Sequence, residues 1–165
     1  MIINEHRYSK EDTVNALEAY YSFFTKTVIM HYAPLPIAAV CGYLYYTSGL
    51  KRFVVFAIIF LLLFLMRYAQ IALGAKYDAM RMNEETGRPD PLIRYEIGDD
   101  IKVFRQGLFH VSIPITDIVG AKQKGADLAV FTRGNYTLYF KAGHYLEGGE
   151  TQLKALVRAQ GANVK

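Results

Sequence analysis

The sequence predicts an α+β membrane protein, in which a two-helix transmembrane hairpin precedes a small antiparallel β partial barrel closed by a C-terminal helix. Three observations predict it. Residues 27–73 are almost wholly apolar, six short strand-like segments separated by turn residues follow residue 91, and an amphipathic segment lies near the end. We therefore expect residues 1–26 to form a cytoplasmic N-terminal amphipathic helix, 27–74 the hairpin, 75–91 a juxtamembrane stalk and linker, and 92–165 a cytoplasmic β domain.

The N-terminal residues predict a helix from about Lys10 to Thr25. Ser9 followed by Asp12 resembles a capping box, and apolar residues then recur at spacings of three and four. Such a helix can lie in the headgroup region, or it can form the first turns of the membrane span. Because charged residues precede the apolar run, the segment is unlike a cleavable signal peptide, and we expect the first span to be retained.

Two stretches, 28–46 and 53–73, are each close to the roughly 20 residues needed to cross a hydrocarbon core. Pro34 and Pro36 predict a kink or break near Tyr32. Three side chains are expected at the membrane interface, namely Tyr45 and Tyr46 in an aromatic belt and Arg67 with its long stem reaching the headgroups.

The connection at 47–52 is short, so the two helices are expected to be antiparallel neighbours. More Lys and Arg residues flank the outer ends of the spans than occupy this connection. By the positive-inside rule, this asymmetry predicts that both termini lie in the cytoplasm. The second span is expected to continue as a helical stalk until Thr86-Gly87 stops it.

After Pro91 the pattern predicts consecutive antiparallel hairpins. The expected strands are 92–97, 101–105, 109–114, 118–124, 128–132 and 136–141, and a helix follows at about 150–160, with Gly161 as its stop. A bent sheet of six strands with a helix plugging one open end has the outline of a pleckstrin-homology-like fold.

Three segments carry a resemblance to a known family: Tyr95 to Ile101, Ile113 to Ile118, and Leu128 to Tyr136. With the preceding hairpin, their order resembles the YcxB-like family of bacterial membrane proteins, which have two spans and a C-terminal pleckstrin-homology-like domain. The resemblance implies a multi-pass protein of the bacterial cytoplasmic (inner) membrane. It implies no catalytic residue, ligand or cofactor.

The residues themselves give little support for catalysis. None of the four histidines, His6, His31, His110 and His144, has a second ligand at metal-site spacing, and Cys41 is the single cysteine. There is no nucleophile elbow and no phosphate-binding glycine loop. We expect no enzymatic activity, metal or cofactor. The net charge of +4 is too small and too dispersed to predict nucleic-acid binding.

Lys122 and Lys124 share a strand face, and they are candidate contacts to an anionic lipid surface. The alternative is that they are solvated strand lysines that discourage edge pairing. The function predicted from the sequence is a membrane-anchored module that binds a protein partner or forms a homo-oligomer. The alternatives are a sensor of anionic lipid and a small transporter or channel subunit.

Overall fold

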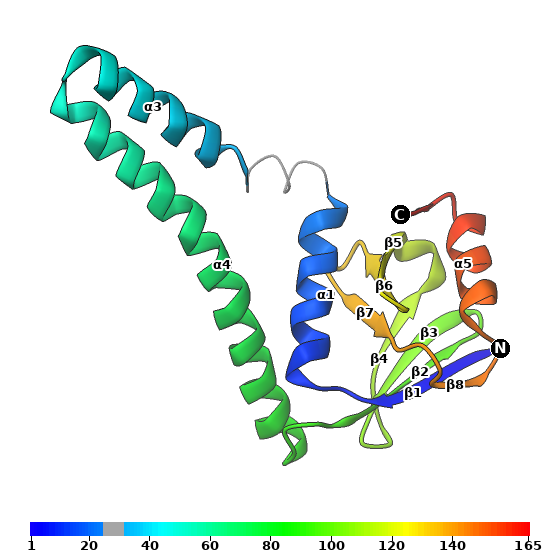
Figure 1. The fold of residues 1–165 in the computed structure, drawn as a ribbon. Helices are drawn as coiled ribbons and strands as arrows, with labels where there is room; N and C mark the ends of the chain where they lie inside the picture. Colours follow the sequence, from blue (N-terminus) through cyan, green and yellow to red (C-terminus); the bar gives the residue numbers. More distant parts are fainter. Residues whose placement is uncertain (25–31) are drawn as a thin grey trace. The chain divides into compact units, whose positions relative to one another are not determined.

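The computed structural model describes residues 1–24 and 32–165, together with every side chain in them except those of Arg67, Tyr68 and Ala79. The chain forms two compact units: residues 1–23 with 75–165, called here the β unit, and residues 24–74, called the hairpin unit (Figure 1). The predicted end of the first helix at Thr25, and positions 28–31 of the predicted first span, lie outside the described residues.

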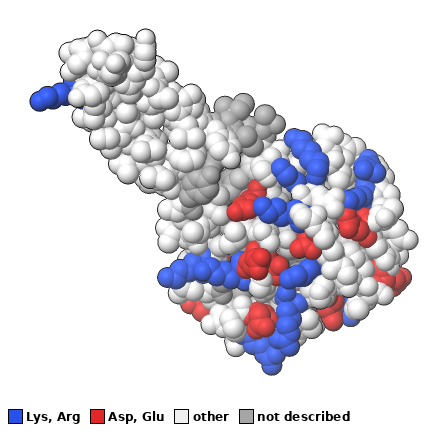
Figure 2. Space-filling model, in the orientation of Figure 1, with Lys and Arg blue, Asp and Glu red and all other residues white. Residues whose placement is uncertain are grey.

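The hairpin unit contains α3 (Pro34–Ser48) and the first part of α4 (Lys51–Thr86). Prolines occupy the first turn of α3, where a missing N–H costs no hydrogen bond, and Gly49 ends this helix with a φ of 69°. The helix α4 is long and apolar enough to cross a membrane, by length and composition. Figure 2 shows the hairpin surface nearly free of charge except at its basic tip. The structure thus supports one membrane helix, and α3 has 15 residues.

Helix α4, which includes the predicted second span, continues without interruption into the β unit, as predicted. The helix α4 ends at Thr86, where Gly87 has a φ of 67° and its N–H donates to the carbonyl of Asn83 over 2.8 Å. The β unit begins on this helix at Ala75, which is completely buried. The segment predicted as a stalk therefore belongs to the β unit from Ala75 onward, although most of its described side chains, Tyr77 and Met80 among them, are exposed.

The β unit contains two sheets. The first has five strands in the order β4-β3-β2-β1-β8, and the second has four in the order β7-β6-β5-β9. Their bounds are β1 (Ile2–Arg7), β2 (Leu92–Ile97), β3 (Asp100–Arg105), β4 (Leu108–Pro114), β5 (Ile118–Lys124), β6 (Asp127–Thr132), β7 (Thr137–Phe140), β8 (Tyr145–Glu147) and β9 (Asn163–Val164). The antiparallel hairpins β2-β3, β3-β4, β5-β6 and β6-β7 confirm the predicted turns.

The predicted division of the chain at residue 26 is wrong. Residues Ile2–Arg7 form β1, which lies between β2 and β8 and runs antiparallel to β2, with Ile2 opposite Ile97 and Arg7 opposite Leu92. The predicted helix follows as α1 (Lys10–Phe23), within the same unit. The sheet is thus completed by residues from both sides of the hairpin.

Helix α1 packs against the four-stranded sheet. The ring of Phe131 lies 4.8 Å from that of Phe23 and 5.9 Å from that of Tyr20, centroid to centroid. Gly120 makes this close approach possible, because a Cβ at this position would lie 2.1 Å from Cζ of Phe23. The apolar face of α1 therefore packs against protein.

The core between the sheets includes Tyr95 and Phe140, whose ring centroids are 4.7 Å apart. Helix α5 (Glu150–Ala159) buries Leu153 and Val157 completely and packs against β5 and β9. One bent sheet of six strands was predicted, whereas the structure has two sheets. The difference arises at Pro114 and the short 3-10 turn η1 (Ile115–Asp117), which separate β4 from β5.

Candidate functional site: an open sheet edge

Strand β4 is an open edge of the five-stranded sheet. It has seven residues, whereas the other edge strands that the structure describes, β7, β8 and β9, have four, three and two. Five of its seven side chains are exposed, and none is Lys, Arg, Asp or Glu. Leu108 and Phe109 at its start are 75% and 60% exposed. Proteins usually protect such an edge with charge or keep it short, so β4 is suited to pairing with another strand.

A β-bulge shapes this edge. Val103 pairs with Val111 and the next residue, Phe104, pairs with Phe109, so His110 is the extra residue of β4. Both His110 and Val111 line a cavity of about 70 Å³. Partial burial and the nearby Arg105 guanidinium lower the pKa of His110. At neutral pH this imidazole is therefore mostly uncharged.

The cavity lies between the two sheets, beside β4 and β7, and has room for one small side chain. Its walls come from β2, β3, β4 and β7, from α4, and from the residues after β1 and before β7: Tyr8, Met82, Ile93, Tyr95, Val103, Arg105, His110, Val111, Tyr136, Thr137 and Leu138. An edge strand next to a side-chain pocket is the arrangement that recognises an extended peptide, since the backbone binds the edge and a side chain enters the pocket.

An ion-pair network joins β3 to the end of α4. The carboxylate of Glu85 accepts hydrogen bonds from Arg81 on its own helix and from Arg105 on β3. The hydrogen bond from Arg81 and the positive charges of both arginines lower the pKa of Glu85. The wall that α4 contributes to the cavity is thereby fixed to the sheet.

The lysines predicted to contact lipid face α1. Lys124 forms an ion pair with Glu18, and Nζ of Lys122 donates to the carbonyl of Ser22 over 3.3 Å. The strand that carries them, β5, lies between β6 and β9 and is not an edge strand. The prediction that they discourage edge pairing is therefore wrong. Lys124 is already paired with a carboxylate within the domain, whereas Lys122 forms no ion pair with the described residues.

The predicted membrane-interface tyrosines lie near the end of α3. Tyr45 and Tyr46 are 42% and 86% exposed, and their place at a membrane interface stays a prediction. Arg67 lies within α4, and its side chain is outside the described part of the chain.

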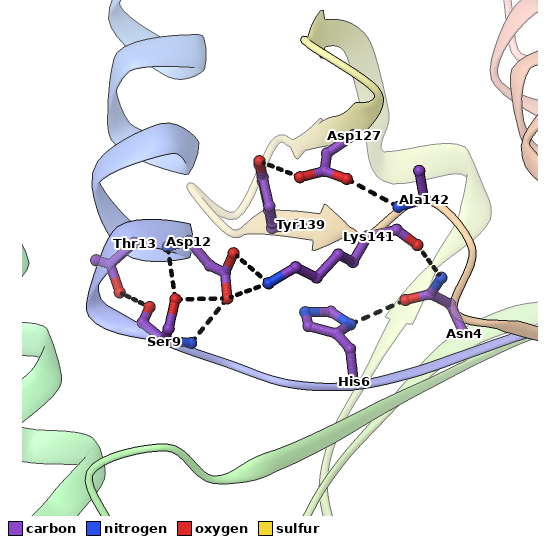
Figure 3. Close-up of polar contacts among 9 residues, drawn as sticks. All are labelled: Asn4, His6, Ser9, Asp12, Thr13, Asp127, Tyr139, Lys141 and Ala142. Carbon is purple, nitrogen blue, oxygen red and sulfur yellow. Dashed lines mark hydrogen bonds and ion pairs between the residues drawn. The ribbon is translucent and has the colours of Figure 1, made fainter.

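A buried polar cluster that the sequence did not indicate lies between β1, the start of α1 and the end of β7 (Figure 3). Asp12 is 3% exposed. Its carboxylate accepts from Nζ of Lys141 at 3.0 and 3.2 Å and from the backbone N–H of Ser9 at 2.8 Å. The Ser9 hydroxyl in turn accepts from the backbone N–H of Asp12, so the predicted capping box is confirmed. Burial alone would raise the pKa of Asp12, but these hydrogen bonds outweigh it and lower the pKa.

His6 occupies the inner end of this cluster and is 2% exposed. Its Nδ1 lies 3.0 Å from Oδ1 of Asn4, whose Nδ2 donates to the carbonyl of Lys141. Because Oδ1 can only accept, Nδ1 must carry the proton. In the described structure Nε2 is buried without a hydrogen-bond partner. Burial accordingly lowers the pKa of His6 to about 4.

The cluster is a packed network that fits a structural role. A second carboxylate, Asp127, accepts from the hydroxyl of Tyr139 and from the backbone N–H of Ala142, both over 2.8 Å. Burial and this hydrogen bond raise the pKa of Tyr139, so its hydroxyl stays a donor at neutral pH. These contacts join β6, β7 and the connection to β8. No group of three potential metal ligands occurs among the described residues.

Some of these features left no signal in the sequence. The cluster joins residues more than a hundred positions apart, so no local spacing could have shown it. The alternation of Phe109, Val111 and Ile113 did predict β4, but whether a strand lies at an edge depends on the topology of the sheet.

The fold and the site together describe a class of protein: an α+β chain with a helix able to cross a membrane and a two-sheet β unit with one open edge. The chain matches no protein-family model, no curated protein and no solved structure. The resemblance to the YcxB-like family stays a prediction.

Proposed function

We propose that the protein is a non-enzymatic, membrane-anchored module that binds an extended segment of a protein partner along β4. The exposed, uncharged edge of this strand carries the proposal. Backbone pairing supplies affinity in such complexes, and the adjoining cavity of about 70 Å³ would select a small side chain. Leu108 and Phe109 add exposed apolar surface for the partner to cover.

The topology of the sheet supports two membrane crossings, with both termini on one side of the membrane. The distribution of Lys and Arg around the apolar stretches supports the cytoplasmic side of a bacterial inner membrane. Paired strands must lie on the same side of a membrane, and β1 pairs with β2 across the whole hairpin. The chain must therefore cross the membrane an even number of times between Arg7 and Leu92. If α4 is one crossing, the apolar residues 28–46 are the natural second one.

Cysteine labelling tests this topology. In a Cys41→Ser background, a membrane-impermeant maleimide added to spheroplasts should label Leu50→Cys, in the reversal between α3 and α4. It should label Leu146→Cys, on β8, only after lysis. Labelling of both positions, or of neither, before lysis would contradict the two-span arrangement.

Photocrosslinking in cells tests the binding edge. A photoreactive residue at Leu108 should form an adduct with one extended segment of one protein, identified by mass spectrometry. Leu146, 64% exposed on the opposite edge strand, is the matched control and should not form it. A synthetic copy of the captured segment should bind the purified full-length protein, and Phe109→Ser should weaken that binding.

The outcomes distinguish the alternatives. If the photoreactive residue forms an adduct with a second copy of this chain, β4 serves self-assembly and does not bind a different protein. Equal adducts at Leu108 and Leu146, or a peptide whose binding is indifferent to Phe109→Ser, would refute the edge site.

A further inference from the structure

Two lysines of the four-stranded sheet contact the last turn of α1. Nζ of Lys122 on β5 donates to the carbonyl of Ser22, and Nζ of Lys165 donates to the carbonyl of Phe23 over 3.1 Å. The ammonium group of Lys165 also lies 5.0 Å from the ring centroid of Phe23. Carbonyls at the end of a helix carry partial negative charge, so this position favours cations.

Both lysines keep positive charge available to a ligand. An ammonium group has three donors, and the contacts described above use one on each lysine. Neither lysine forms an ion pair with a carboxylate among the described residues, whereas Lys124 on β5 is paired with Glu18, one turn before Ser22 on α1. In Figure 2 basic surface gathers over the end of the β unit where Figure 1 draws the last turn of α1 and the C-terminus.

The length of chain limits how far this surface can lie from the apolar segments. Val28, where the first apolar stretch begins, is five positions after Phe23, and an extended chain of five steps spans at most about 17 Å. On the other connector, Ala75 is already buried in the β unit two residues after Leu73, the end of the second apolar stretch. Neither connector allows the β unit to move far from a membrane that holds the hairpin.

We infer that the surface around Lys122 and Lys165 docks on the anionic headgroups of the bilayer that holds the protein's own hairpin. The phosphate groups of acidic lipids accept from the remaining ammonium donors, and the surface sets which side of the β unit faces the membrane. This inference rests on the membrane anchoring in the proposed function and is independent of the β4 edge.

Fluorescence quenching of the full-length protein in nanodiscs tests it. The chain has no tryptophan, so Asn163→Trp, at an exposed position of β9 opposite Gly120, places a single reporter beside this surface. The bilayers are phosphatidylcholine alone, or phosphatidylcholine and phosphatidylglycerol in equal parts, each with a trace of headgroup-nitroxide lipid as quencher. Co-elution with the nanodisc shows separately that the hairpin is inserted.

The expected result is stronger quenching in the phosphatidylglycerol bilayer, with the ratio of docked to undocked protein raised about fivefold for each lysine at low salt. High salt should remove the difference in quenching between the two bilayers, because it screens exposed charges.

The double variant Lys122→Gln, Lys165→Gln should also remove this difference in quenching, whereas the double variant Lys122→Arg, Lys165→Arg should keep it. Lys102→Gln, an exposed lysine on β3, is the matched charge control and should change nothing.

Three results would overturn the inference in protein that co-elutes with nanodiscs. They are equal quenching in the two bilayers, a response to phosphatidylglycerol that survives the double glutamine variant, and an equal response from a reporter at Leu146→Trp on β8.

Discussion

Acidification is expected to destabilise the β unit through His6. The proton on Nδ1 is held by Asn4, so a second proton would have to go to Nε2, which is buried and has no acceptor in the described structure. The folded state therefore resists protonation, and the pKa is lowered from 6.5 to about 4. In the unfolded chain the imidazole binds a proton freely below about pH 6.5.

The sign and size of the effect follow from this difference. Between pH 6.5 and 4 the unfolded state binds more protons than the folded state, so stability falls as the pH falls. The loss is about 2 kcal/mol at pH 5 and approaches about 3 kcal/mol below pH 4. At pH 5 this corresponds to a decrease in Tm of roughly 8 °C. Asp12 affects stability at lower pH than His6 does. Its pKa is lowered, so the stability that its ionised carboxylate contributes is lost only as the pH falls below the usual pKa of an aspartate.

The assay is thermal unfolding of the full-length protein in detergent at pH 7 and pH 5. Near-ultraviolet circular dichroism of the buried tyrosines follows the β unit selectively. His6→Asn keeps an N–H donor for Asn4 but cannot titrate, so it should lose much less stability than the wild type over this range. His144→Asn, at an exposed position whose ring lies 6.2 Å from that of His6, is the control. Because burial is the largest cause of the lowered pKa of His6 and His144 a lesser one, this variant should lose nearly as much stability as the wild type.

The pKa of His110 is also lowered, so its protonation also reduces the stability of the folded state as the pH falls. This contribution is the same in every variant, so it cancels when the variants are compared. If the wild type and His6→Asn lose the same stability between pH 7 and pH 5, the assignment of a neutral, buried His6 is refuted.

Three further predictions concern packing. Gly120→Ala should lower the free energy of unfolding by about 1–3 kcal/mol, because the new methyl group displaces the ring of Phe23. Gly98→Ala should lower it much less, because a methyl group there meets nothing within 4 Å. Thermal unfolding of both variants checks this. Asp12→Ala should destabilise the β unit by about 2–3 kcal/mol, since it removes the capping box and leaves a half-buried lysine unpaired. The fragment 92–165 lacks β1 and α1 and exposes the surfaces they cover, so size-exclusion chromatography should show it aggregated; a monodisperse, folded fragment would contradict the divided domain.

The strands that could be predicted are those with local signals. Leu92–Ile97 and Ile118–Lys124 were predicted with their observed bounds, because alternating apolar residues and flanking turns mark them. Ile2–Arg7 was missed, since it contains three charged or amide side chains and its partner on β2 is about ninety positions away. The two-residue strand Asn163–Val164 is too short to have any periodicity.

Only part of the candidate site could be predicted from the sequence, for the same reason. The sequence indicated β4 as a strand. It could not show that β4 is the exposed edge, because that depends on β1 occupying the position beside β2. For the same reason it placed Lys122 and Lys124 on a free face, which α1 in fact covers.

Both connectors between the hairpin and the β unit begin or end in packed structure. At its end α1 packs Phe23 against the sheet, and α4 enters the β unit as a continuous helix with Ala75 buried. The same helix contributes Met82 to the cavity beside β4, and its Glu85 is paired with Arg105 on β3. The end of α4 that lines the cavity is therefore part of the β unit, so the connector after the second apolar stretch and the wall beside β4 belong to one packed structure.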